Sequence, residues 1–178
     1  MINCYAFGAV PPFAQGLVRD RPSIRHSRPG LILRVALAAS LLFASTVISA
    51  GEYFDRDGAA LRGYDPVSYF TEGKPQPGLP AHSYVYKGSK FQFASADNQR
   101  LFAESPDKYA PQFGGFCAYG TAQGYKVSTQ PDAFSVVNGK LYLNYNREVV
   151  KIWQQDVPGN IARAEGNWPE VSKTEPKD

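Results

Sequence analysis

Residues 133–145, which read AFSVVNGKLYLNY, carry the strongest local signal in the chain. Two short runs of β-forming residues flank the dipeptide Asn138-Gly139, which favours the type I′ turn of a two-residue hairpin. A second hairpin is predicted over residues 82–93, where polar and apolar residues alternate on both sides of a turn that contains Gly88. The sequence therefore predicts two antiparallel hairpins.

Helical segments are predicted between and after these hairpins. Ser95 stands at an N-cap position before a short apolar stripe, and Pro106 suits the first position of a second, turn-long helix. From residue 146 onward, apolar residues recur at helical spacing on both sides of Pro158-Gly159. The elements together predict an α+β fold, with a small antiparallel sheet of two hairpins, several short helices and a C-terminal helical pair.

Residues 1–50 have the pattern of an export leader. Five Arg and one Asp precede or interrupt an apolar run, and small residues at 49–51 suit a cleavage site. We expect a signal peptide at 1–50 and an exported protein in the periplasm. The alternative is an uncleaved leader that anchors the protein at its N-terminus, facing the periplasm, because the run is near the lower limit for a membrane span.

The rest of the chain divides into a lead-in at 51–60, one domain at 61–171 and a flexible tail at 172–178. Without the leader, the chain holds 14 basic and 15 acidic residues, a net charge of −1. This balance lacks the basic patch of a nucleic-acid-binding protein, so no nucleic-acid partner is expected. Cys4 lies in the leader, which leaves Cys117 as the one thiol and excludes an internal disulfide.

Three residues are candidates for a site. Cys117 could supply a thiolate ligand for copper or zinc, or a redox or catalytic thiol, and the alternative is a small buried core residue. His82 could bind a metal ion, or it could form a hydrogen bond that holds the entry of its hairpin. With Asp65 nearby, the three would form a mixed N, S and O site, which is incomplete unless a second chain shares the metal.

Six segments of the chain together carry a family resemblance. They are GYDPVSYF at 63–70, HSY at 82–84, FQFAS at 91–95, PDKYAP at 106–111, GGFCA at 114–118 and LYLNY at 141–145. On these segments the chain resembles the YHS-domain family over about residues 60–170. It looks most like the exported, stand-alone YHS proteins, a group whose biochemical role is poorly defined.

The chain departs from the metal-handling members of that class. Those relatives carry a Cys-Pro-x-Cys turn and a later Cys-x-x-x-Cys pair, a set that suits a soft metal held by thiolates. The corresponding positions here are Asp65 and Ser68, then Ala94 and Asn98. A tetrathiolate site is therefore not expected.

These observations lead to one main hypothesis and two alternatives. The main hypothesis is an exported YHS-domain protein that binds a soft transition metal or a small ligand in the bacterial envelope. A pocket lined by some of the many tyrosines and tryptophans would suit the ligand. The first alternative is a non-catalytic structural or interaction module with an envelope protein partner. The second is a thiol-dependent enzyme that uses Cys117.

Overall fold

The structure is a computed structural model that describes residues 52–177. The predicted export leader lies outside these residues. The strands are β1 (Asp55–Arg56), β2 (Ala59–Ala60), β3 (Leu79–Tyr86), β4 (Ser89–Phe93), β5 (Phe134–Val137) and β6 (Lys140–Leu143). The α-helices are α1 (Ser68–Thr71), α2 (Ala96–Glu104), α3 (Pro106–Tyr109), α4 (Ala118–Ala122), α5 (Arg147–Trp153) and α6 (Val157–Val171), and the 3-10 turns are η1 (Leu61–Gly63), η2 (Gln112–Gly115) and η3 (Gln154–Asp156).

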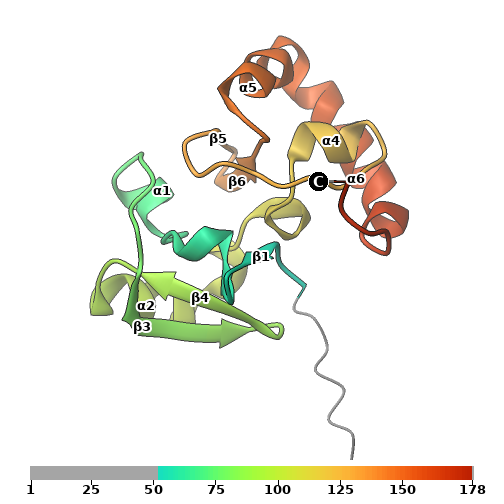
Figure 1. The fold of residues 1–178 in the computed structure, drawn as a ribbon. Helices are drawn as coiled ribbons and strands as arrows, with labels where there is room; N and C mark the ends of the chain where they lie inside the picture. The colour runs from blue at the N-terminus through green and yellow to red at the C-terminus, as the bar shows by residue number, and fades with distance from the viewer. Residues whose placement is uncertain (1–51, 178) are drawn as a thin grey trace, which may run out of the picture. The chain divides into compact units, whose positions relative to one another are not determined.

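The strands form three separate antiparallel pairs (Figure 1). The pairs β3–β4 and β5–β6 are the two predicted hairpins, and the α+β class is confirmed. Asn138 and Gly139 have φ angles of 50° and 72°, as the predicted turn requires. The two hairpins do not join into one sheet, because no strand of one pairs with a strand of the other among the described residues.

The third pair, β1–β2, lies in the segment that the sequence indicated to be a lead-in. Asp57 and Gly58 form its turn with φ angles of 60° and 77°. The Gly58 N–H donates to Asp55 Oδ1 across 2.9 Å and closes this turn. Each strand has two residues, too few for an alternation pattern to be visible in the sequence.

Strand β6 separates two hydrophobic cores. Because neighbouring side chains in a strand point to opposite faces, Leu141 and Leu143 enter one core while Tyr142 enters the other. The first, the hairpin core, contains Tyr53, Ala60, Leu61, Val67, Tyr69, Phe91, Phe93, Phe102, Tyr109, Ala110, Leu141 and Leu143. The second, the helical core, contains Phe113, Ala118, Ala122, Tyr142, Trp153 and Ala164.

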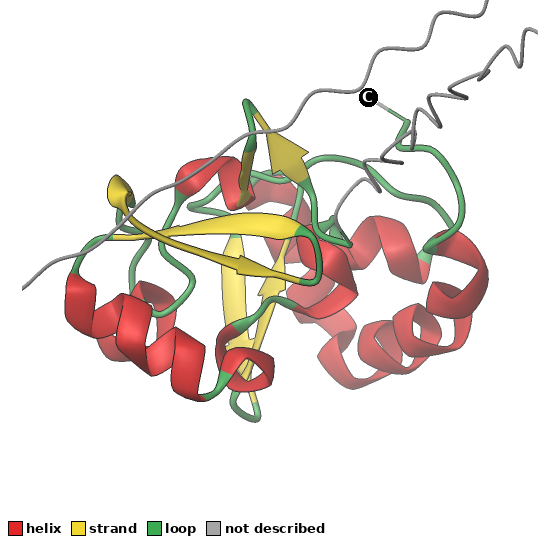
Figure 2. Cartoon of the chain, turned by 90° about the horizontal axis from the view of Figure 1, so that it is seen from below, coloured by secondary structure: helices red, strands yellow, loops and turns green. Residues whose placement is uncertain are grey.

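The helices lie in two groups, with strands between them (Figure 2). Ser95 accepts a hydrogen bond from the Asn98 N–H and so caps α2 as predicted. Helices α5 and α6 form the predicted C-terminal pair, and Asn146 and Asp156 cap them. The division between them lies at η3, however, and Pro158-Gly159 falls within the first turn of α6. Beyond α6, the Lys177 N–H donates to the Lys126 carbonyl across 2.9 Å.

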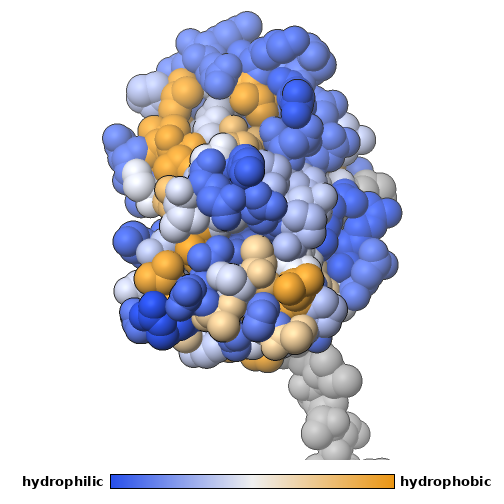
Figure 3. All heavy atoms as spheres, turned by 90° about the vertical axis from the view of Figure 1, so that its left-hand side faces the viewer, coloured by the Kyte–Doolittle hydropathy of each residue, from blue (hydrophilic) through white to orange (hydrophobic). Residues whose placement is uncertain are grey.

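Large apolar side chains that are exposed include Leu79, Val85, Val136, Tyr145 and Ile152. On the face drawn in Figure 3, apolar patches are separated by hydrophilic residues. Within residues 52–177, no helix has the length and apolar character needed to cross a membrane.

Two left-handed turns meet near the centre of the molecule. Leu61 and Gly63 begin and end the first turn, with φ angles of 55° and 75°. Phe113 and Gly115 begin and end the second, with φ angles of 54° and 75°. A Cβ on Gly115 would lie 2.7 Å from Leu61 Cδ2, so only glycine allows the turns to approach this closely.

Candidate functional site

Cys117 is a buried residue that caps a short helix. It is 1% exposed, and it precedes α4. Its Sγ accepts a hydrogen bond from the Gly120 N–H at 3.3 Å. Burial raises the pKa of the Cys117 thiol, and this effect outweighs the lowering by the backbone N–H groups of Gly120, Tyr145 and Tyr119. The thiol is therefore neutral and shielded at pH 7, which opposes nucleophilic or redox chemistry.

Asn144 connects the thiol to the end of β6. Its Oδ1 accepts hydrogen bonds from the Cys117 thiol at 3.6 Å and from the Tyr119 N–H at 3.1 Å. Its Nδ2 is buried and has no hydrogen-bond partner among the described residues. Because the Tyr119 N–H can only donate, the Asn144 side-chain amide must turn its oxygen, and not its NH₂ group, toward α4.

Asp65 is fully buried and holds several segments together. Its carboxylate accepts hydrogen bonds from Val67 N–H at 2.8 Å, Ala94 N–H at 2.9 Å and Asn98 Nδ2 at 2.6 Å. The Ser68 hydroxyl donates to the Asp65 carbonyl at 2.7 Å. We call Asp65, Ser68, Ala94 and Asn98 the polar network. These are the four positions at which the resemblance places cysteines in metal-handling relatives.

His82 lies on β3, where the pairing with β4 is irregular between Leu79 and Ser83. Its side chain is half-buried and shares no hydrogen bond with Cys117 or Asp65. Residues 52–177 contain no group of three or more His, Cys, Asp and Glu side chains placed to hold a metal ion. The structure therefore does not assemble Asp65, His82 and Cys117 into one metal site within the part of the chain that it describes.

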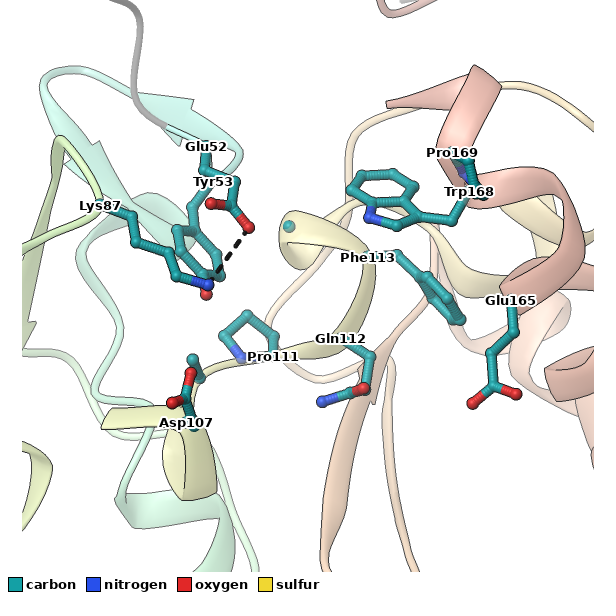
Figure 4. A pocket seen from close by; sticks show the side chains of 12 residues that line it. Glu52, Tyr53, Lys87, Asp107, Pro111, Gln112, Phe113, Glu165, Trp168 and Pro169 are labelled. Carbon is teal, nitrogen blue, oxygen red and sulfur yellow. Dashed lines mark ion pairs between the residues drawn. The ribbon is translucent and has the colours of Figure 1, made fainter. Parts of the chain in front are cut away.

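A pocket of about 360 Å³ is lined in part by Phe113 and Gly114 of the second left-handed turn (Figure 4). We call it the aromatic pocket. One wall carries the Glu52, Tyr53 and Lys87 side chains, and the facing wall belongs to α6. The complete lining is Glu52, Tyr53, Lys87, Asp107, Ala110, Pro111, Gln112, Phe113, Gly114, Glu165, Trp168 and Pro169.

The aromatic wall of this pocket is fixed by packing. The Trp168 and Phe113 ring centroids lie 5.7 Å apart with the rings tilted by 61°. Gly114 leaves room for this arrangement, because a Cβ there would lie 3.5 Å from Trp168 Cη2 and 2.6 Å from the Glu52 carbonyl oxygen. Tyr53 packs edge-on against Phe91 of the hairpin core with centroids 5.0 Å apart. The rings are thus held in place before any ligand arrives.

The charged groups of the aromatic pocket are mostly acidic. Its lining contains three carboxylates, those of Glu52, Asp107 and Glu165, and the single ammonium group of Lys87. Lys87 Nζ lies 3.5 Å from Glu52 Oε1, and this ion pair is drawn in Figure 4. Two negative charges remain after that pair is counted. The pocket therefore favours a ligand that has both an apolar surface and a positive charge.

Sequence reasoning found only part of this pocket. Its lining comes from four segments at 52–53, 87, 107–114 and 165–169, which are distant along the chain. The tyrosines and tryptophans predicted an aromatic ligand pocket, with Trp168 among its candidate residues. The paired glycines at 114–115 indicated a close backbone approach.

Comparisons of the whole chain with family models, with curated proteins and with solved structures find no match.

Proposed function

We propose that the protein is a non-catalytic, exported binding protein of the YHS type, and that it holds a small organic ammonium ion in the aromatic pocket. The observation that carries this proposal is the combination of three aromatic side chains with an excess of carboxylates in one pocket. A volume of about 360 Å³ suits a ligand of metabolite size.

The expected binding energy has two sources. A cation that leaves water for the face of an aromatic ring gains about 0.5–2 kcal/mol, and Trp168 is the best such surface in the pocket. The carboxylates of Asp107 and Glu165 add a favourable field. Each has one neighbour already: Asp107 accepts a hydrogen bond from the Tyr86 hydroxyl at 2.5 Å, and Glu165 lies 3.8 Å from Lys140 Nζ. Neither neighbour lines the pocket, so both acids keep oxygens for a ligand.

Two observations favour this function over the alternatives. The burial of Cys117 and the raised pKa of its thiol argue against a thiol-dependent enzyme. The polar network places hydrogen-bonded groups where a soft metal would require thiolates. The polar network also brings close together the four positions at which metal-handling YHS relatives carry cysteines, and this proximity supports the resemblance.

Calorimetric titration of the purified chain tests the proposal. The probes are phenylethylammonium and 2-phenylethanol, which have the same ring and differ in charge. We expect the ammonium ion to bind and the uncharged alcohol not to bind. Glu165→Gln should weaken binding about fivefold to tenfold, whereas Glu148→Gln on α5 should leave it unchanged, because Glu148 is also exposed but lies outside the pocket. Equal binding of both probes would contradict the proposal.

Export has its own test. The N-terminus of the protein recovered from the envelope fraction of an expressing cell should begin near residue 51. Recovery of the intact chain in the membrane fraction would favour the anchored alternative, and recovery in the cytoplasm would contradict export.

A soft metal remains a second candidate only as an ion shared between two chains. His82 lies on β3 and is half-buried, so the His82 side chains of two copies of the chain could each supply one ligand to a shared ion. Titration with Cu(I) and with Zn²⁺ checks this, with the double variant His82→Ala, Cys117→Ala as the control. Stoichiometric binding that the double variant loses would favour this candidate over the ammonium ligand.

A further inference from the structure

A second pocket, of about 580 Å³, lies beside the first left-handed turn. We call it the arginine pocket. It shares no lining residue with the aromatic pocket. Its lining is Phe54, Asp55, Arg56, Arg62, Ser128, Gln130 and Tyr145.

The Arg62 side chain is held in one position. The Arg62 backbone has a φ of 57° within η1, a left-handed conformation that costs a non-glycine residue about 1 kcal/mol or more. The Arg62 Nε donates to the Thr129 carbonyl at 2.7 Å, and the guanidinium carbon lies 5.5 Å from the centre of the Phe54 ring. These contacts use one N–H of the guanidinium and leave its two terminal NH₂ groups for a ligand.

Arg56 supplies a second guanidinium to the same pocket. Neither Arg56 nor Arg62 forms an ion pair with a carboxylate of residues 52–177. The one acid in the lining, Asp55, accepts a hydrogen bond from the Gly58 N–H within its own turn. Two guanidinium groups and one carboxylate give the lining a net charge of +1.

The remaining lining groups fit an organic anion. Gln130 offers an amide donor, and Tyr145, which is 45% exposed, offers a phenol, while Phe54 adds a second aromatic ring to the lining. The backbone next to Tyr145 is held by a hydrogen bond. The Gln130 N–H donates to the carbonyl of Asn144, the residue before Tyr145, at 3.2 Å. The pocket thus combines two unpaired cations with ring surfaces.

We propose that the arginine pocket binds a small organic oxyanion, a carboxylate or a phosphate attached to an apolar or aromatic group. The fork of N–H donors on a guanidinium matches two oxygens of either group, and Arg62 is already oriented for such a contact. The apolar part of the ligand packs against Phe54 and Tyr145. This site is separate from the ammonium site and takes a ligand of the opposite charge.

Binding of phenyl phosphate and of benzoate to the purified chain tests this inference, with benzamide as the uncharged probe. We expect both anions to bind and benzamide not to bind. Arg56→Gln should weaken binding about tenfold, because a charge-assisted contact is lost. Arg56→Lys should recover only part of that loss, because an ammonium group keeps the charge but not the planar fork. Arg100→Gln on α2 is the matched control, since Arg100 is exposed and lies outside the pocket.

Three outcomes would overturn the inference: benzamide binding as well as benzoate, equal affinity for inorganic phosphate and phenyl phosphate, or unchanged affinity in Arg56→Gln. Arg62→Gln should weaken binding more than Arg56→Gln does. Its circular dichroism spectrum must match that of the native protein, because loss of the Thr129 contact could also loosen the fold.

Discussion

The side-chain oxygen of Asn144 accepts the hydrogen of the buried Cys117 thiol across 3.6 Å, so β6 and the start of α4 are joined by a contact between two side chains. The same oxygen accepts the Tyr119 N–H. The thiol thus helps to hold the start of α4 against the end of β6, and its chemistry is that of a structural group.

The stability of the protein should depend on pH through Cys117. Because the pKa of the thiol is raised in the folded state, its contribution is fully present below the ordinary thiol pKa of about 8.5 and is lost as pH rises through the folded value. Urea unfolding at a series of pH values should show a decline above about pH 8.5. Cys117→Ala should decline less steeply over the same range. Parallel curves for the two proteins would contradict a buried, neutral thiol.

Replacement of the polar network by four cysteines should create a metal site. In the variant Asp65→Cys, Ser68→Cys, Ala94→Cys, Asn98→Cys, the new thiols would lie on segments that hydrogen bonds of 2.6–2.9 Å now connect. Four thiolates in reach of one another favour tetrahedral Zn²⁺ or Co²⁺. We expect one Co²⁺ per chain, detected by its thiolate absorption bands.

The three-cysteine variant that retains Asn98 is the control for this experiment. It should bind Co²⁺ more weakly, because one ligand is missing. If the four-cysteine variant folds and binds no metal, the geometric part of the YHS resemblance fails.

Gly114 should tolerate alanine much less well than Gly124. Both have positive φ angles, 59° and 85°, so both variants carry backbone strain of about 1 kcal/mol. A Cβ on Gly114 would also lie 2.6 Å from the Glu52 carbonyl oxygen, whereas a Cβ on Gly124 meets nothing within 4 Å. Gly114→Ala should therefore lower the free energy of unfolding by at least about 1 kcal/mol more than Gly124→Ala does. Equal melting temperatures would show that the chain near Glu52 can move aside.

Asp65→Asn should destabilise the fold although it preserves the side-chain shape. The carboxylate accepts three hydrogen bonds, and an amide would turn an NH₂ group toward at least one of those donors. We expect a loss of about 2–3 kcal/mol in chemical denaturation. Asp97→Asn is the control: its side chain is 85% exposed, so its loss should stay below about 1 kcal/mol. Similar losses in both variants would argue against a structural role for Asp65.

Local signals in the sequence predicted local structure well. The turn at Asn138-Gly139 and the cap at Ser95 follow from the conformations and hydrogen bonds of a few neighbouring residues, and both are present. The β1–β2 hairpin escaped prediction because its strands are only two residues long. The separation of the two longer hairpins into different sheets depends on tertiary packing, which has no local signature.

The candidate sites depend still more on tertiary packing. Cys117 and Asp65 were visible as candidates from residue type alone, but only the fold places each inside its own hydrogen-bond network. Trp168 was a candidate for either the aromatic core or a ligand pocket, and its place across the aromatic pocket from Glu52 requires the full chain path. Arg62 belonged to no sequence motif, and its side-chain contacts with Thr129 and Phe54 join segments that are distant along the chain.

Strand β6 couples the unfolding of the two hydrophobic cores. Its central residues fill both of them, so neither core can open while the other keeps its full packing. Residues 52–177 should therefore melt in one cooperative transition, and the amide hydrogen of Tyr142, which faces Ser135 of β5, should exchange with solvent only when the whole molecule unfolds. A four-residue strand thus sets the size of the cooperative unit for both sets of helices.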